Sequence, residues 1–159
     1  MGELIYRPPT EQDHPDVVAA VDSWWDYPEA QAEARRSERV ALVPRLFLQH
    51  FTDTSLIVRD EDRLVAFLIG FLSQSRPDEA YVHFIGVEPR YRGRGLGAEL
   101  YERFFGIVRE DRRRKVLAIT SASNTRSQAF HRRMGFTVSD PVTNYDGRGG
   151  VHVTFSQEL

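Results

Sequence analysis

The chain has 159 residues and contains no cysteine. This absence excludes disulfide bonds, zinc sites with cysteine ligands and any cysteine nucleophile, and we expect no bound metal. Long apolar runs are also missing, because the longest, Leu64 to Leu72, is far too short to cross a bilayer. The first residues, Met-Gly-Glu-Leu-Ile, lack the basic start and apolar core of a signal peptide. We therefore expect a cytoplasmic protein with no membrane partner.

A surplus of positive charge is missing too. The chain has 21 Lys and Arg against 23 Asp and Glu, which gives a formal net charge of −2. Proteins that bind nucleic acid generally depend on such a surplus, so we expect no nucleic-acid partner. A chain of this length with 41% hydrophobic residues can bury one core, which predicts a single domain over residues 1–159.

Apolar spacing along the chain predicts an α/β protein with the element order βααβββαβαββ. We expect a polar, irregular segment over 25–37 and a helix between 40 and 51 that Pro44 starts or breaks. Residues 64–72 are apolar on both faces, which predicts a central strand covered by helices on each side. The other strands are predicted at 4–6, 55–59, 79–87, 116–120, 137–138 and 151–155, and the other helices at 14–24 after Asp13 as N-cap, from 96 onward, and at 124–134.

The strand predicted at 79–87 leads into a glycine-rich segment, Val87-Glu88-Pro89-Arg90-Tyr91-Arg92-Gly93-Arg94-Gly95-Leu96-Gly97-Ala98. Its glycines at alternate positions can bring bare N–H groups against an anion, and the helix that follows adds unpaired N–H donors and its positive dipole end. Arg92 and Arg94 add charge. The segment is therefore a candidate phosphate cradle; alternatively, its glycines serve only a sharp strand-to-helix connection. Its spacing fits neither the Walker loop nor the dinucleotide fingerprint.

A second segment follows in the chain, Asn124-Thr-Arg-Ser127-Gln-Ala-Phe130-His131-Arg-Arg-Met-Gly135-Phe136. Arg92-x-x-Gly95-x-Gly97 resembles the pyrophosphate loop of the GNAT superfamily of acyl-CoA-dependent N-acyltransferases, and this segment resembles that superfamily's second signature. The two stand in the expected order, and the resemblance covers roughly residues 55 to 138. It implies the GNAT fold, a mixed sheet with helices on both faces.

The resemblance also implies an activity, the direct transfer of an acetyl group from acetyl-CoA to a small amine or protein amine in a ternary complex, with a homodimer as one possible state. A non-catalytic acyl-CoA-binding module and a nucleotide-binding protein are the alternatives. Backbone groups of Ile85 and Val87 would pair with the pantetheine arm, and a bulge at Gly86 would free the Val87 N–H to polarise the thioester carbonyl. The implied cofactor-binding residues are Ile85, Gly86, Val87, Arg92, Gly93, Arg94, Gly95, Leu96, Gly97, Asn124 and His131.

Two histidines are the catalytic candidates. His83 lies near the end of the strand before the cradle, where it could take the acceptor's proton, or it could be a structural strand histidine. His131 stands where the superfamily has a tyrosine that acts as the acid, so it could protonate or bond the leaving thiolate. Alternatively, His131 only packs, and water or Tyr145 supplies the proton. Glu79 and Glu88 are the carboxylate alternatives for the base, although Glu88 is expected to be a solvated loop residue.

Three further groups of residues have both a structural and a functional interpretation. Asn124 is by default a helix N-cap, and the resemblance also places its side chain on the cofactor. Residues 112–115 form a basic run, which is usually a solvated turn. Near the end of the first helix, aromatic and acidic side chains could shape a pocket for a cationic amine, or could be plain packing. These side chains are Trp24, Trp25 and Tyr27, with Asp22, Asp26 and Glu29.

Overall fold

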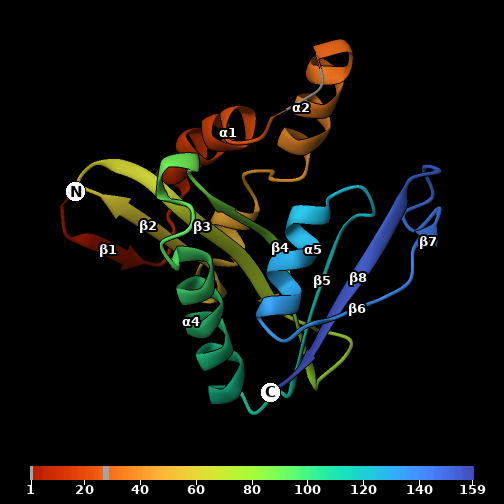
Figure 1. The fold of residues 1–159 in the computed structure, drawn as a ribbon. Helices are drawn as coiled ribbons and strands as arrows, with labels where there is room; N and C mark the ends of the chain where they lie inside the picture. The colour runs from red at the N-terminus through yellow and green to blue at the C-terminus, as the bar shows by residue number, and fades with distance from the viewer. Residues whose placement is uncertain (1, 27–28) are drawn as a thin grey trace. The chain divides into compact units, whose positions relative to one another are not determined.

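The computed structural model describes residues 2–26 and 29–159 (Figure 1). They form two compact units, Met1–Phe71 with Phe84–Phe104, and Leu72–His83 with Phe105–Leu159. Strand β4 (Glu79–Val87) and helix α4 (Leu96–Glu110) each have residues in both units. The single domain expected from composition stays a prediction.

The first unit contains an antiparallel set of strands in the order β1 (Leu4–Arg7), β2 (Leu56–Asp60) and β3 (Arg63–Leu72). The end of β4 lies beside β3, because the N–H of Glu88, just past β4, donates a hydrogen bond of 2.9 Å to the carbonyl of Val65. The strands predicted at 4–6, 55–59, 64–72 and 79–87 are therefore confirmed.

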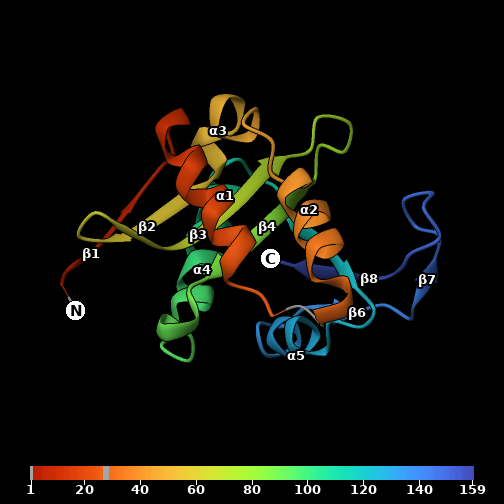
Figure 2. The same cartoon turned by 90° about the horizontal axis from the view of Figure 1, so that it is seen from above.

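Strand β3 is buried on both faces. Phe67 and Leu68 point to opposite faces, and each is 0% exposed. On one face, Val17 and Val21 of helix α1 (His14–Ser23) join Phe67 in a single hydrophobic cluster. Figure 2 shows α1 lying across β2 and β3. The central position predicted for residues 64–72 is confirmed.

The segment between α1 and β2 differs from the prediction. Helix α2 (Ala32–Ala41) occupies much of the segment expected to be irregular, and the helix expected over 40–51 is reduced to α3 (Phe47–His50). None of the residues of α2 is buried, so the sequence has no apolar stripe that marks it. Pro44 prevents a helix from continuing through it. Short 3-10 turns lie at Glu11–Asp13, Glu29–Gln31, Thr52–Thr54 and Pro89–Tyr91.

Asp13 precedes α1 as predicted, but its side chain makes no capping hydrogen bond to that helix. The carboxylate instead accepts hydrogen bonds of 2.7 Å each from Arg7 of β1, Arg59 of β2 and the Thr10 N–H. The side chain is only 3% exposed. Burial raises the pKa of Asp13, but these hydrogen bonds outweigh burial and hold it well below its usual value. An ionised carboxylate therefore joins β1, β2 and the start of α1.

Helix α4 carries the apolar stripe that the sequence predicts from Leu96 onward. Leu100 and Phe104 are 0% exposed, and Val108 completes the buried face. At 15 residues, α4 is the longest helix in the described part of the chain. None of the helices over residues 2–26 and 29–159 has both the length and the apolar character needed to cross a membrane.

The second unit contains the parallel pairing of the fold. The first part of β4 runs parallel to β5 (Lys115–Ser121), with Tyr81 opposite Leu117. Strand β5 pairs antiparallel with β8 (Val151–Glu158), and the short strands β6 (Thr137–Val138) and β7 (Val142–Thr143) also pair with β8. Parallel and antiparallel pairs together confirm the mixed α/β class, whereas β7 was not predicted.

The basic run at 112–115 is only partly a solvated turn. The guanidinium of Arg113 donates hydrogen bonds to the carbonyls of Ser73 at 2.6 Å and Glu79 at 2.9 Å, and its side chain is 15% exposed. Arg113 therefore anchors the start of β4 within the second unit.

Candidate functional site

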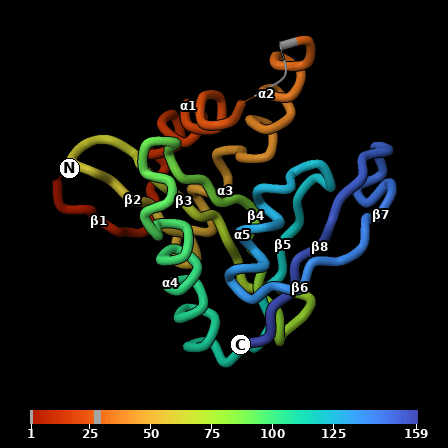
Figure 3. The backbone as a smooth tube through the Cα atoms, in the orientation of Figure 1, coloured from red at the N-terminus to blue at the C-terminus, as the bar shows by residue number. Residues whose placement is uncertain are grey.

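The chain passes from β4 through the glycine-rich loop into α4, as Figure 3 traces. Gly93 and Gly95 have φ angles of +73° and +82°, a conformation that residues with a side chain rarely adopt. A Cβ at either glycine would meet no other atom within 4 Å, so this side of the loop is open. The N–H of Glu99 donates to the Gly95 carbonyl at 2.9 Å, which places the first turn of α4 directly after the loop. Left-handed glycines that lead into a helix N-terminus fit a phosphate group well.

The two arginines of the loop have partners inside the first unit. Arg92 donates from Nε to the carbonyl of Val87 at 3.0 Å and from Nη2 to the carbonyl of Trp24 at 2.5 Å. Trp24 is the C-cap of α1, where a cation is favoured by the helix dipole. The guanidinium of Arg94 lies 5.4 Å from the ring centroid of Tyr91. Arg92 therefore ties the loop to α1, and its contact with a phosphate stays a prediction.

Gly86, near the end of β4, is required by aromatic packing. A Cβ there would lie 2.8 Å from an atom of the Phe67 ring and 3.0 Å from an atom of the Trp25 ring. Trp25 also packs edge-on against Phe84 at 5.4 Å. Ring atoms therefore occupy the space beside Gly86, and the bulge that would free the Val87 N–H stays a prediction. Tyr27, expected beside these tryptophans, lies outside the described residues.

Glu88 is not the solvated loop residue that the sequence predicts, since it is only 4% exposed. Its Oε1 accepts a hydrogen bond from Arg63 and lies 3.3 Å from Nε of Arg90. Its Oε2 is buried with no hydrogen-bond partner among the described residues. The prediction is wrong because the burial of Glu88 depends on folding, which also brings Arg63, on β3 and 25 residues away in the sequence, to its carboxylate.

In the second unit, Asn124 caps helix α5 (Thr125–Arg133). Its Oδ1 accepts the N–H of Ser127 at 3.2 Å, and its Nδ2 donates to the hydroxyl of Thr120 at 3.1 Å. Gly135, with φ at +95°, follows the end of the helix, where a left-handed residue is common. The N-cap role predicted for Asn124 is confirmed, and its contact with a cofactor stays a prediction.

His131 lies on α5 and is 4% exposed. Its ring stacks on Phe155 with centroids 3.8 Å apart, and the ring of Phe136 contacts it edge-on. Nδ1 lies 2.7 Å from the carbonyl of Ser127. A carbonyl only accepts hydrogen bonds, so Nδ1 carries the proton, and in the neutral ring Nε2 is an acceptor.

Burial lowers the pKa of His131 to about 4. At pH 7 only about one ring in a thousand would then carry the second proton that a general acid needs. A neutral ring could donate from Nε2 only by giving up its hydrogen bond to Ser127. These contacts favour the packing role for His131, and its part in catalysis stays a prediction.

Three other side chains of the second unit are candidates for proton transfer. Tyr81 and His83 point to the same face of β4, because they are two residues apart on a strand. Burial raises the pKa of Tyr81 to about 12, so its hydroxyl keeps its proton at neutral pH. Tyr145, the alternative acid in the sequence, is 47% exposed. Tyr81 was not among the residues predicted to transfer a proton, although its strand position places it on the same face as His83.

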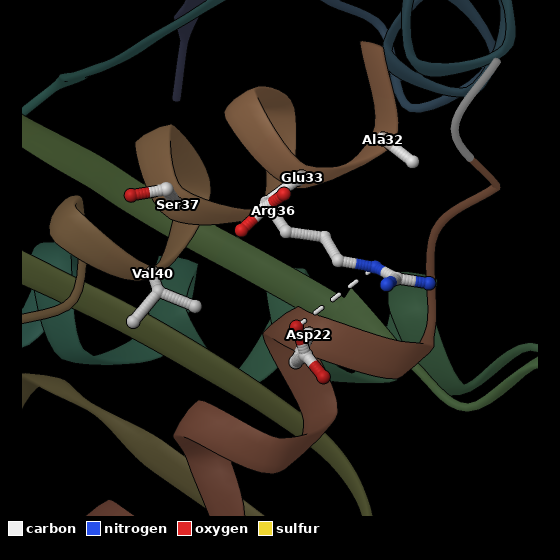
Figure 4. A pocket seen from close by; sticks show the side chains of 6 residues that line it. All are labelled: Asp22, Ala32, Glu33, Arg36, Ser37 and Val40. Carbon is white, nitrogen blue, oxygen red and sulfur yellow. Dashed lines mark ion pairs between the residues drawn. The ribbon is translucent and has the colours of Figure 1, made fainter. Parts of the chain in front are cut away.

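A pocket of about 580 Å³ opens between α1 and α2 in the first unit (Figure 4). Asp22 of α1 and Arg36 of α2 face each other across it, with 3.9 Å between Oδ1 and Nε. Of the acidic side chains predicted near the end of α1, Asp22 therefore lines a pocket. Its other lining residues were not anticipated: Ala32, Glu33, Ser37 and Val40.

Curated relatives align with part of the chain. An L-2,4-diaminobutyric acid acetyltransferase of Shouchella clausii is 34% identical over 91 residues, which are 56% of this chain and 50% of that protein. A mycothiol acetyltransferase of Corynebacterium glutamicum is 31% identical over 91 residues, which are 57% of this chain and 30% of that protein. The chain thus spans half the length of these relatives or less.

Solved structures match over nearly the whole chain. The PaiA N-acetyltransferase from Thermoplasma acidophilum, in complex with coenzyme A, has a TM-score of 0.78 at 13% identity, over 99% of both chains. Diaminobutyrate acetyltransferase from Paenibacillus lautus, in complex with its substrate and coenzyme A, has a TM-score of 0.68 at 18% identity, over 98% of this chain and 95% of the other. These likenesses establish the predicted fold. The model of the acetyltransferase (GNAT) family matches residues 17–136, and the chain belongs to that family.

Proposed function

We propose that this protein is an N-acetyltransferase that binds acetyl-CoA and an amine together and transfers the acetyl group directly. The observation that carries the proposal is the loop with left-handed Gly93 and Gly95 at the N-terminus of α4, in a chain of the acetyltransferase family. Relatives named for L-2,4-diaminobutyric acid make this small amine the first acceptor to test. A protein amine, a homodimer and a cytoplasmic location stay predictions.

The reaction forms a bond between the amine nitrogen and the acetyl carbonyl carbon, and it breaks the bond between that carbon and sulfur. One proton leaves the amine and one reaches the sulfur, so N-acetyl amine and coenzyme A result. The glycine loop would bind the pyrophosphate, and backbone groups of Ile85 and Val87 would bind the pantetheine arm. His83 would take the amine proton, with His131 and Tyr81 as the candidate donors to sulfur.

The absence of cysteine makes the test direct, because the protein itself adds no thiol to the measurement. Purified protein, acetyl-CoA and each of several amines are mixed, and free coenzyme A is measured with a thiol reagent. The panel contains L-2,4-diaminobutyrate, 1,3-diaminopropane, lysine and a peptide with a free N-terminus. We expect thiol release that depends on the amine. Mass spectrometry should show that the amine has gained one acetyl group.

Two outcomes would contradict the proposal. If calorimetry shows binding of coenzyme A but no amine promotes thiol release, the protein is a non-catalytic acyl-CoA-binding module. If ATP or NAD displaces coenzyme A at comparable concentrations, the loop belongs to a nucleotide-binding protein.

A further inference from the structure

Two polar contacts join the hairpin of β2 and β3 to the segment that leads into the glycine loop. Asp60, at the end of β2, lies opposite Arg63, at the start of β3. The hydroxyl of Tyr91 donates a hydrogen bond of 2.5 Å to Oδ2 of Asp60, and the guanidinium of Arg63 donates to Oε1 of Glu88. Both carboxylates are buried. The hairpin therefore holds the chain at two points just before the glycines.

The hydrogen bond between Asp60 and Tyr91 fixes both side chains. Oδ1 of Asp60 accepts the N–H of Gly2 at 2.8 Å, so each oxygen of the carboxylate has a donor. The bond lowers the pKa of Asp60 and raises that of Tyr91, so at neutral pH the carboxylate is ionised and the hydroxyl keeps its proton. The N–H of Tyr91 also donates to the carbonyl of Glu88 at 2.8 Å. Tyr91 is thus held both at its backbone and at its hydroxyl.

The ring of Tyr91 contacts a cation of the glycine loop. The guanidinium of Arg94 lies 5.4 Å from the ring centroid, where a cation is attracted to the electron-rich face of the ring. An ionised carboxylate on the hydroxyl polarises the phenol and strengthens this attraction. Because Arg94 stands between the left-handed Gly93 and Gly95, the contact fixes a positive charge at the loop.

We infer that Tyr91 is a positioning residue for cofactor binding: anchored by Asp60, its ring holds the guanidinium of Arg94 ready for a phosphate oxygen of coenzyme A. The inference rests on the proposed function, in which the glycine loop binds the pyrophosphate. A long side chain that is already held in place loses less conformational entropy when it binds a ligand. The guanidinium can keep its contact with the ring meanwhile, because its N–H donors lie in its plane and point away from its flat face.

A double-mutant cycle separates this positioning role from a purely structural one. The Kd for coenzyme A is measured by calorimetry in the wild type, Tyr91→Phe, Arg94→Ala and the double variant. Tyr91→Phe keeps the ring but removes its anchor, and we expect the Kd to rise about 3- to 10-fold; for Arg94→Ala we expect about tenfold or more. When Arg94 is already alanine, Tyr91→Phe should change the Kd by less than about twofold.

A structural role would show itself differently. Urea unfolding should give the same loss of stability for Tyr91→Phe with and without Arg94, because the hydrogen bond to Asp60 is lost in both cases. Asp60→Asn should raise the Kd of the wild type but add little to Tyr91→Phe, since Asp60 acts through the hydroxyl. Tyr6→Phe is the matched control: Arg103 lies over the Tyr6 ring at 4.1 Å, and neither residue belongs to the glycine loop. It should leave the Kd unchanged.

Two results would overturn the inference. One is an unchanged Kd in Tyr91→Phe. The other is an equal rise in the Kd with and without Arg94, which would mean that the hydroxyl shapes the backbone of the loop and not the position of the Arg94 side chain. In both cases thiol release that depends on the amine would still support the acetyltransferase function. A wild-type protein that binds no coenzyme A would contradict both the inference and the proposed function.

Discussion

Replacing Gly95 with alanine tests whether the backbone of the loop determines cofactor affinity. Gly95 has φ at +82°, and an added Cβ would meet nothing within 4 Å, so backbone strain is the whole cost. That strain is about 1–2 kcal/mol for a residue with a side chain. Because the loop is open on this side, we expect it to relax to an unstrained shape. Binding must then restore the original shape, which raises the Kd for coenzyme A about 5- to 30-fold.

Isothermal calorimetry measures the Kd for coenzyme A, and urea unfolding measures any part of the strain energy that lowers the free energy of unfolding. If the loop resists relaxation, the same 1–2 kcal/mol, roughly, appears as lost free energy of unfolding instead. Gly106→Ala is the matched control, because Gly106 lies inside α4, where a Cβ again meets nothing within 4 Å. It should add about 0.5–1 kcal/mol of stability and leave the Kd unchanged. Gly95→Ala with unchanged Kd and unchanged stability would refute the reasoning.

Three further predictions concern titratable side chains. Between pH 6.5 and about 4, the unfolded chain binds a proton at His131 that the folded protein does not, so the free energy of unfolding should fall by up to roughly 3 kcal/mol as the pH drops through this window. Urea unfolding at several pH values should show that His131→Phe removes this loss. Asp13→Asn should lower the free energy of unfolding at pH 7 by about 3–5 kcal/mol, whereas Asp16→Asn, at an exposed carboxylate, should lower it by at most about 1 kcal/mol. Because the pKa of Asp13 is lowered in the folded protein, the stability that Asp13 contributes is present above about pH 4 and is lost as the pH falls further. His83→Ala should lower kcat at least tenfold, by a general-base estimate, with the Kd for coenzyme A unchanged, and an unaltered kcat in steady-state assays would make His83 structural.

Features that depend on neighbours in sequence were predicted well. Strand β4 has the predicted bounds, Glu79–Val87, because its alternation and its flanking turns are local. Helix α5 follows its N-cap Asn124 and ends before Gly135, both of which are local signals. The left-handed glycines of the loop belong to the same class, since only glycine adopts that conformation without strain.

Features that depend on contacts between distant residues were not predictable. Helix α2 has no buried residue, so the sequence lacks the stripe that reveals a helix. Glu88 is buried and accepts a hydrogen bond from Arg63, 25 residues away in the sequence, and Arg92 reaches a carbonyl 68 residues away. The pocket requires Asp22 and Arg36 to face each other from two helices, one of which was not expected. In each case the fold had to bring the partners together first.

The carboxylate of Asp13 has a consequence for the association of this protein in acid. Strand β1 is the outermost strand and pairs with β2, and the hydrogen bond from Arg7 to Asp13 adds a contact between β1 and the start of α1. Without β1, the backbone N–H and carbonyl groups along one side of β2 would be open to a strand from another molecule, as in edge-to-edge aggregation. Because the neighbouring arginines hold the pKa of Asp13 well below its usual value, the hydrogen bond from Arg7 should persist in moderate acid, and we expect β1 to keep covering that edge there.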